Sequence, residues 1–229
     1  MYTSVGIGIT TNVFGSQVGA GGPPPPVFPN PINNEFSMEF DSADATYFKV
    51  TDEVLGGLSA FSISFWYNTT SIGSDRPIIA KWQVGPANFL LYHDAPNGWR
   101  ILFNTSAGAA GGQSNLIATA NIWQYLGVSW DGTNINMYLR DFTGTSSDWT
   151  AVSANPGGTV NPTAPWRIGH DVTRSMDGYL DELAIWNTNL SKDTFDGIFQ
   201  CTVDNPGKVA NLNETPEGAP LAWYRMGDN

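Results

Sequence analysis

The sequence predicts an all-β protein, built as a sandwich of two antiparallel sheets, and three features support this. Residues 61–67, FSISFWY, alternate large apolar and small polar side chains, which is the period of a strand. The chain has 25 Gly and 15 Pro for turns, and 9 Trp, 12 Phe and 8 Tyr for a core. Residues 179–186 are mostly apolar on both faces, as expected of a strand inside a two-sheet stack. We therefore assign residues 34–229 to one β domain and residues 1–33 to an extended Gly/Pro-rich arm.

The first half of the domain reads as short strands joined by polar turns. Residues 35–50 predict two strands around a loop at 41–45, and residues 76–81 predict another. Residues 88–104 predict a hairpin that turns at 96–98, and the Gly- and Ala-rich residues 105–114 predict a flexible loop. The strand at 61–67 should bury one set of side chains between the sheets and turn the other outward: Phe61, Ile63, Phe65 and Tyr67 inward, Ser62 and Ser64 outward.

The second half contains a further hairpin, a helix and a closing strand. Residues 122–140 predict a hairpin around Asp131-Gly132, residues 141–165 a long loop, and residues 165–171 a strand. Residues 220–228 predict a last strand that pairs near the first.

The strand at 179–186 is followed by a change of period. Strict alternation would put Tyr179, Asp181, Leu183 and Ile185 on one face, and Leu180, Glu182, Ala184 and Trp186 on the other. After a polar turn at 187–189, Ser191 is a suitable N-cap and Asp193 falls in the first turn. Phe195, Ile198 and Phe199 then follow helical spacing, so residues 192–199 predict a short helix lying against the sandwich.

These segments resemble the laminin G-like, concanavalin A-like jelly-roll domains. The resemblance is carried by DGYLDELAIWNTNLS at 177–191, FSISFW at 61–66, the hairpin with WDG at 130–132, and WRIG at 166–169. The opening segment departs from the family pattern, because Ser42 replaces a Gly and Ala45 an Asp. The resemblance covers about residues 34–228 and implies a jelly-roll fold, but fold alone does not give function.

Charge and composition restrict the partners. The formal net charge is −11, with 10 basic residues that are scattered along the sequence, which argues against binding to nucleic acid or to an anionic membrane. The first basic residue is Lys49 and no long apolar run is present, so we expect no signal peptide and no transmembrane segment. The single cysteine, Cys201, should be a buried structural thiol.

Catalysis is not predicted. Glycanases of this fold carry an E-x-D-x-(x)-E strand whose carboxylates share a face, whereas the comparable strand here offers Asp177 and Asp181, with Glu182 on the other face. A rim calcium bound by Asp41, Asp44, Asp171 or Asp177 is a further possibility, but no regular ladder of acids supports it, and no cofactor is expected.

A sugar site could lie where aromatic, acidic and amide side chains share a loop. The candidate residues are Trp82, Tyr92, His93, Asp94, Asn97 and Trp99. The alternative is structural, because most of the nine tryptophans must fill the core.

The arm gives the leading functional hypothesis. Residues 1–31 carry no charge, and Val5, Ile7 and Ile9 alternate with small residues as in a strand that could pair with another subunit. Phe14 and the run Pro23, Pro24, Pro25 and Pro26 complete an extended segment that cannot form a core. Free-standing laminin G-like modules with such ends resemble surface components of tailed-bacteriophage virions. We therefore expect a non-enzymatic virion surface protein, decorating the capsid or part of an appendage, attached to other subunits through this arm. The alternative is a module that binds cell-surface glycans.

Overall fold

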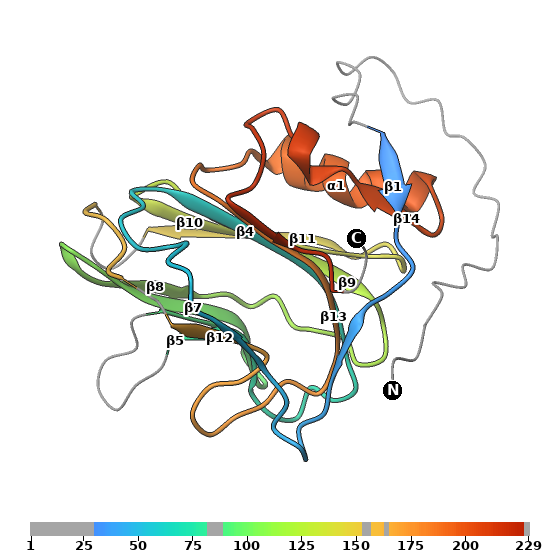
Figure 1. Ribbon diagram of the computed structural model, residues 1–229, viewed down its shortest axis with the longest axis horizontal. Coiled ribbons are helices and arrows are strands. Elements are labelled where there is room, and N and C mark those ends of the chain that lie inside the picture. The colour runs from blue at the N-terminus through green and yellow to red at the C-terminus, as the bar shows by residue number, and fades with distance from the viewer. Residues whose placement is uncertain (1–29, 82–88, 153–156, 163–164, 227–229) are drawn as a thin grey trace.

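The computed structural model describes residues 30–81, 89–152, 157–162 and 165–226. It confirms the predicted all-β sandwich: two antiparallel sheets are stacked face to face, and a third, smaller layer lies above them (Figure 1). Neither helix that these residues form has the length and apolar character needed to cross a membrane.

One sheet has seven strands in the order β11-β10-β9-β4-β13, with β15 and β2 both paired to the far edge of β13. The predicted closing strand, β15, therefore lies along the same edge as the early strand β2. The bounds are β2 (Met38–Phe40), β4 (Phe61–Thr69), β9 (Gln124–Trp130), β10 (Asn134–Asp141), β11 (Ser146–Val152), β13 (Gly178–Trp186) and β15 (Ala222–Tyr224).

The other sheet has six strands in the order β3-β12-β5-β6-β7-β8. The predicted hairpin at 88–104 is confirmed as β6 and β7, and the predicted strand at 76–81 is β5. The bounds are β3 (Phe48–Val50), β5 (Arg76–Lys81), β6 (Phe89–Asp94), β7 (Gly98–Thr105), β8 (Gly108–Gln113) and β12 (Trp166–Ile168).

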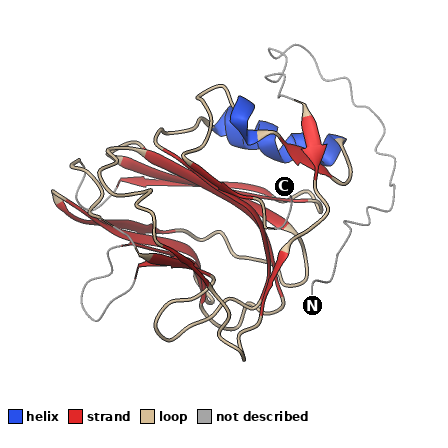
Figure 2. Cartoon of the chain, in the orientation of Figure 1, coloured by secondary structure: helices blue, strands red, loops and turns tan. Residues whose placement is uncertain are grey.

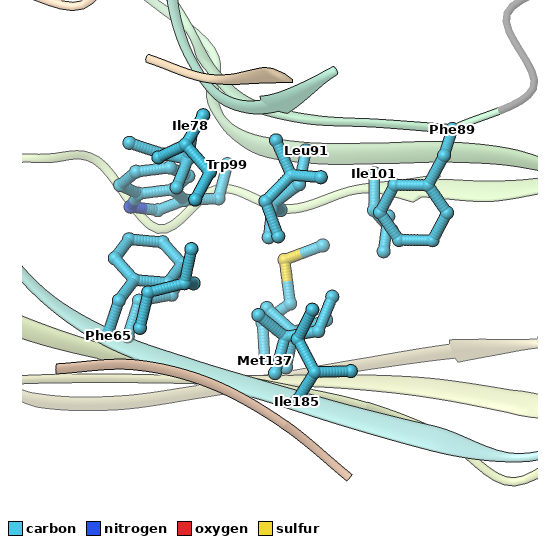
Figure 3. Packing of buried hydrophobic residues seen from close by; sticks show 14 of the residues in the cluster. Phe65, Ile78, Phe89, Leu91, Trp99, Ile101, Met137 and Ile185 are labelled. Carbon is cyan, nitrogen blue, oxygen red and sulfur yellow. The ribbon is translucent and has the colours of Figure 1, made fainter. Parts of the chain in front are cut away.

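The core fills the space between the two sheets. Phe61, Ile63 and Phe65 of β4 are fully buried there, as predicted, together with Leu183 and Ile185 of β13. Figure 3 shows the opposing sets of side chains: Phe65, Met137 and Ile185 rise from the seven-stranded sheet to meet Ile78, Phe89, Leu91, Trp99 and Ile101 of the six-stranded sheet.

The third layer covers the outer face of the seven-stranded sheet (Figure 2). It contains α1 (Lys192–Asp204), the 3-10 helix η1 (Leu212–Glu214), and a small sheet of β1 (Pro31–Asn33) with β14 (Lys208–Ala210). Packing is close, since a Cβ on Gly127 of β9 would lie 2.4 Å from the Phe195 ring. Ser62 faces outward as predicted but is buried in this layer, where it accepts a hydrogen bond from Leu190 N at 2.8 Å.

The helix begins as predicted and ends later. The Ser191 side chain accepts from Thr194 N, so Ser191 is the N-cap, and Asp193 lies in the first turn. The predicted end at residue 199 is wrong, because the helix continues to Asp204 and its buried face extends to Cys201 and Thr202. The Cys201 thiol is free and buried as expected, and burial raises its pKa.

The prediction that side chains alternate strictly between the two faces of β13 is also wrong. The pairing of β13 with β4 shifts register between Asp181 and Ala184, and Glu182 has φ of +52°, so a β-bulge interrupts the strand. The bulge turns Leu180, Leu183 and Ile185 into the core between the sheets. A single period of two could not show this, because the extra residue changes which face each later side chain takes.

Two predicted loops are strands. Residues 105–114 include β8, which pairs along β7, and residues 141–165 include β11, which pairs along β10. Both are edge strands rich in small or polar residues, so they lack the alternation that marks a buried strand. In addition, Pro31–Asn33 at the end of the predicted arm forms β1, which pairs with β14.

Candidate functional site

No described helix or strand covers the outer face of the six-stranded sheet, whereas the third layer covers the outer face of the seven-stranded sheet (Figure 2). Alternate residues of its strands point outward, including Lys49 of β3, Arg167 of β12 and Arg100 of β7. Lys81, at the end of β5, lines a cavity on this face with Lys49 and Arg167. Half of the 10 basic residues of this acidic chain are therefore on or beside one face: Lys49, Lys81, Arg100, Arg167 and Arg174. We call it the basic face.

The cavity on the basic face has a volume of about 270 Å³. That is close to the lower limit for small-molecule sites, so it suits one sugar-sized group. The exposed Tyr47, which precedes β3, lies at its edge with 47% of its surface accessible. The residues that line the cavity are Tyr47, Lys49, Ala80, Lys81, Pro165, Trp166, Arg167 and Asp171.

Two of the cations that line this cavity are neighbours across a pair of strands. In the antiparallel pairing of β3 with β12, Lys49 lies directly opposite Arg167. The guanidinium carbon of Arg167 lies 4.6 Å from the centroid of the Tyr47 ring, a cation–π contact. Its Nη1 donates to His170 Nδ1 at 3.2 Å and to the carbonyl oxygen of Asp171 at 3.3 Å. Burial and the neighbouring Arg167 guanidinium lower the pKa of His170, which keeps the ring neutral, so that it accepts this bond at neutral pH.

The acid that lines the cavity does not neutralise these cations. The Asp171 carboxylate accepts from the backbone N–H groups of Thr173 and Arg174, both at 2.7 Å. It also forms an ion pair with the Arg174 side chain at 2.6 Å. Arg174 makes a second ion pair with Asp75 at 2.7 Å. The Asp171 carboxylate is therefore bound to Arg174 and to its own loop, and within the described residues it forms no ion pair with Lys49 or Arg167.

A second hollow, of about 600 Å³, lies between the free edges of the two sheets. It adjoins the first, because Lys49 lines both. It is mainly apolar and carries Phe48, which is 40% exposed, and Tyr224 of β15. Its lining residues are Met38, Phe48, Lys49, Val50, Thr51, Asp52, Ile168, Trp223, Tyr224, Arg225 and Met226. We call it the edge cleft.

The structure separates the sugar-binding residues proposed from the sequence. His93 and Trp99 point into the core, where they are 2% and 1% exposed and lie 5.5 Å apart by ring centroids. They cannot stack on a sugar, so this part of the prediction is wrong and the structural alternative holds. Burial also lowers the pKa of His93. Trp82 lies outside the described residues.

Tyr92 and Asp94 alternate with His93 along β6 and so take the opposite face. Tyr92 is largely covered: Arg174 lies over its ring at 4.7 Å, and Arg100 donates to its hydroxyl at 3.1 Å. Asp94 pairs with Arg100 at 3.5 Å, and Asn97 is exposed in the turn that follows. Tyr92 and Asp94 therefore lie on the basic face, and Asn97 lies in the turn at its end. All three are about one strand away from the cavity.

Tyr47, Lys49 and Arg167 were not predicted from the sequence. The sequence signal for Lys49 and Arg167 lies in FKV and WRI, where a basic residue stands between two apolar ones and must face outward on a strand, but Tyr47 lies outside both segments. The missing information was the register that places the two cations side by side.

The carboxylates considered for catalysis are held in structural contacts. Asp181 and Glu182 are each 3% exposed. Asp181 accepts from Asn34 Nδ2 at 2.8 Å, and Glu182 accepts from Trp223 Nε1 at 2.5 Å and pairs with Arg225. The β-bulge at Glu182 breaks the strict alternation of β13. The prediction that Glu182 lies on the face opposite Asp181, which assumed that alternation, therefore does not hold as stated.

Three of the four aspartates considered for calcium are engaged in other contacts, and Asp171 has been described above. Asp41 accepts from Ala43 N at 2.8 Å, and Asp177 binds Thr70 and lies 3.6 Å from Arg76. Within the described part of the chain, no three or more His, Cys, Asp or Glu side chains are grouped to hold a metal ion.

Comparisons with known proteins agree with this architecture. The sequence profile of the family described as the concanavalin A-like lectin/glucanases superfamily matches residues 41–194. A search of curated protein sequences finds no match.

Three solved structures illustrate the likeness. Tailspike protein 2 of an Escherichia coli O157:H7 bacteriophage is 11% identical with a TM-score of 0.58, over 86% of this chain and 28% of the tailspike. A putative carbohydrate binding protein of Bacteroides ovatus is 15% identical with a TM-score of 0.55, over 87% and 53%. The CBM40 module of the Ruminococcus gnavus IT-sialidase, solved with α2,3-sialyllactose, is 13% identical with a TM-score of 0.53, over 69% and 92%. At these identities the likeness concerns the fold, and the chain spans well under two thirds of the first two proteins.

Proposed function

The chain belongs to the concanavalin A-like lectin/glucanases superfamily, and from this membership and the basic face we propose that it is a non-enzymatic glycan-binding module. The observation that carries the proposal is the cavity lined by Tyr47, a sugar-sized hollow on the sheet face that no described helix or strand covers. Structural neighbours that are themselves described as carbohydrate binding support it as fold-level analogy.

The cavity offers the two kinds of contact that sugars use. Tyr47 presents an aromatic ring and a hydroxyl at its edge, and the ring can lie against the apolar C–H face of a pyranose. Lys49 and Arg167 present several N–H donors for hydroxyl or acidic groups. Because these groups sit on strands and Arg167 is already held by its neighbours, little order need be lost on binding.

Tyr47→Ala should abolish or strongly reduce glycan binding, by at least tenfold in Kd, because it removes the aromatic edge and the contact that holds Arg167. The measurement is binding to an immobilised glycan array, followed by calorimetric titration with the strongest ligand. Phe48→Ala is a matched control, since Phe48 is the next residue, is 40% exposed and lines the edge cleft instead. If Phe48→Ala removes binding and Tyr47→Ala does not, the sugar lies in the edge cleft and the proposed site is wrong.

We also propose that the chain does not cleave glycans. The three acids considered, Asp177, Asp181 and Glu182, are paired with Arg76, Asn34 and Arg225 rather than arranged around a free space, which supports this. We expect no release of reducing ends from a panel of polysaccharides incubated with the purified protein. Release that disappears in Asp181→Asn would contradict the proposal.

A second candidate function is assembly into a larger particle, such as a virion surface. The specific observation in its favour is the uncharged sequence that precedes β1, with its strand-like Val5, Ile7 and Ile9 and four consecutive prolines. Among the described strands, β8 and β11 are the last of their sheets, and an edge strand of this kind is where such an arm on a neighbouring copy could pair. Attachment through the arm and display of a glycan site are compatible functions.

A further inference from the structure

We infer that the ligand of the basic face carries a carboxylate, and that Lys49 and Arg167 bind it as a pair; this inference rests on the proposed glycan-binding function. The ligand class is therefore a sugar residue of the uronic or sialic acid kind, rather than a neutral sugar.

The first observation is the register of the two cations. Lys49 and Arg167 are direct partners across an antiparallel pair of strands. Like charges placed directly opposite each other destabilise a sheet. The cost is unexpected in this chain, which has 21 acidic residues and 10 basic ones and could have supplied an acid at either position. An anion bound between the two would remove the repulsion.

The second observation concerns the carboxylates around the pair. Among the residues that the structure describes, no carboxylate forms an ion pair with Lys49 or with Arg167. Asp171 lines the same cavity, but its carboxylate is bound by Arg174 and by two backbone N–H groups.

The third observation is the state of the Arg167 guanidinium. Its Nη1 is used for His170 Nδ1 and the Asp171 carbonyl, and its plane lies against Tyr47. Within the described chain, Nε and Nη2 have no hydrogen-bond partner. Nε and Nη2 lie on the same edge of the planar guanidinium, and their two parallel N–H groups can bind both oxygens of one carboxylate. The contacts on Nη1 fix the guanidinium and leave this edge available.

The size of the cavity identifies the acid as part of a sugar unit. About 270 Å³ holds roughly one ring with its substituents. One guanidinium edge and one ammonium match a single carboxylate, while Tyr47 lines the same cavity and offers an aromatic surface to the rest of the sugar.

The test is calorimetric titration of the full chain with two matched pairs of ligands. The first is 3′-sialyllactose against lactose, and the second is digalacturonic acid against its methyl ester. We expect at least one acid to bind no less than tenfold tighter than its neutral counterpart, and the pair that shows this discrimination identifies which acidic sugar is preferred.

Arg167→Gln and Lys49→Gln should each remove most of the discrimination, and Arg167→Lys should restore only part of it, because the charge returns without the fork. Lys208→Gln is the control, since Lys208 is an exposed lysine of β14 in the third layer, and it should bind like the wild type. Circular dichroism of each variant establishes that it is folded.

The outcomes separate the inference from the function it rests on. Equal binding of acidic and neutral sugars, with loss of both in Tyr47→Ala, would overturn the carboxylate inference and leave glycan binding in place. Equal loss of discrimination in Lys208→Gln would show a general charge effect and overturn the assignment to the Lys49–Arg167 pair. No binding by any array glycan would overturn both.

Discussion

Phe65→Ala should lower the free energy of unfolding by about 3–5 kcal/mol. Phe65 is fully buried in β4 and contacts the rings of Tyr67 and Trp99, with centroids 5.8 and 5.7 Å away. Trp99 belongs to the opposite sheet, so the substitution would open a cavity at the point where the two sheets meet (Figure 3). Denaturant unfolding followed by tryptophan fluorescence measures the change.

Phe36→Ala is the matched control for this effect. Phe36 is 39% exposed, and its truncation should cost about 0.5 kcal/mol or less. If Phe65→Ala were as stable as Phe36→Ala, Phe65 would not lie between two sheets, and the sandwich described here would be contradicted.

Deletion of residues 1–29 should leave the thermal midpoint of unfolding nearly unchanged and abolish assembly into the parent oligomer or particle. The deletion leaves β1 and its pairing with β14 in place. It also leaves the hydrogen bond from Arg225 to the Asn33 carbonyl oxygen, at 2.7 Å, which ties the two ends of the domain together. The arm itself has no charge and few large apolar groups with which to stabilise the domain. Calorimetry gives the midpoint, and light scattering gives the oligomeric state.

A longer deletion, of residues 1–33, separates the two roles. It removes β1 as well as the arm, so it should lower the midpoint in addition to preventing assembly. A protein lacking residues 1–29 that still assembles like the full chain would end the assembly hypothesis while leaving glycan binding untouched.

Strands and helix starts could be predicted from the sequence where the local pattern of side chains determines the structure. FSISFWY alternates because one face of its strand packs into the core between the two sheets, and Ser191 with Asp193 marks a helix start by its capping chemistry. Such signals depend on neighbours in the chain. They are readable without knowing what the segment packs against.

Elements that depend on distant partners were not readable. β8 is GAAGGQ, which acquires its strand conformation from pairing with β7, and β11 likewise pairs with β10. The bulge at Glu182 reverses the faces of β13 through one added residue, which no periodicity reveals.

The candidate site shows the same difference between local signals and those that depend on distant strands. Residues 92–99 combine aromatic and polar groups in sequence, but the pleat of β6 sends His93 inward and Tyr92 outward, and β7 takes Trp99 into the core. Lys49 and Arg167 are far apart in the sequence and become neighbours only through the register of β3 with β12. Their proximity results from strand pairing, so the sequence alone does not reveal it.

The central claim, that a glycan binds the basic face beside Tyr47, is tested most directly by nuclear magnetic resonance. Backbone amide shifts of the labelled full chain would be followed during titration with the strongest array ligand. We predict the largest shifts at residues 47–49, 80–81 and 165–171, which surround the cavity. Shifts confined to residues 222–226 of the edge cleft, or to the turn at 94–98, with none around Arg167, would contradict the claim.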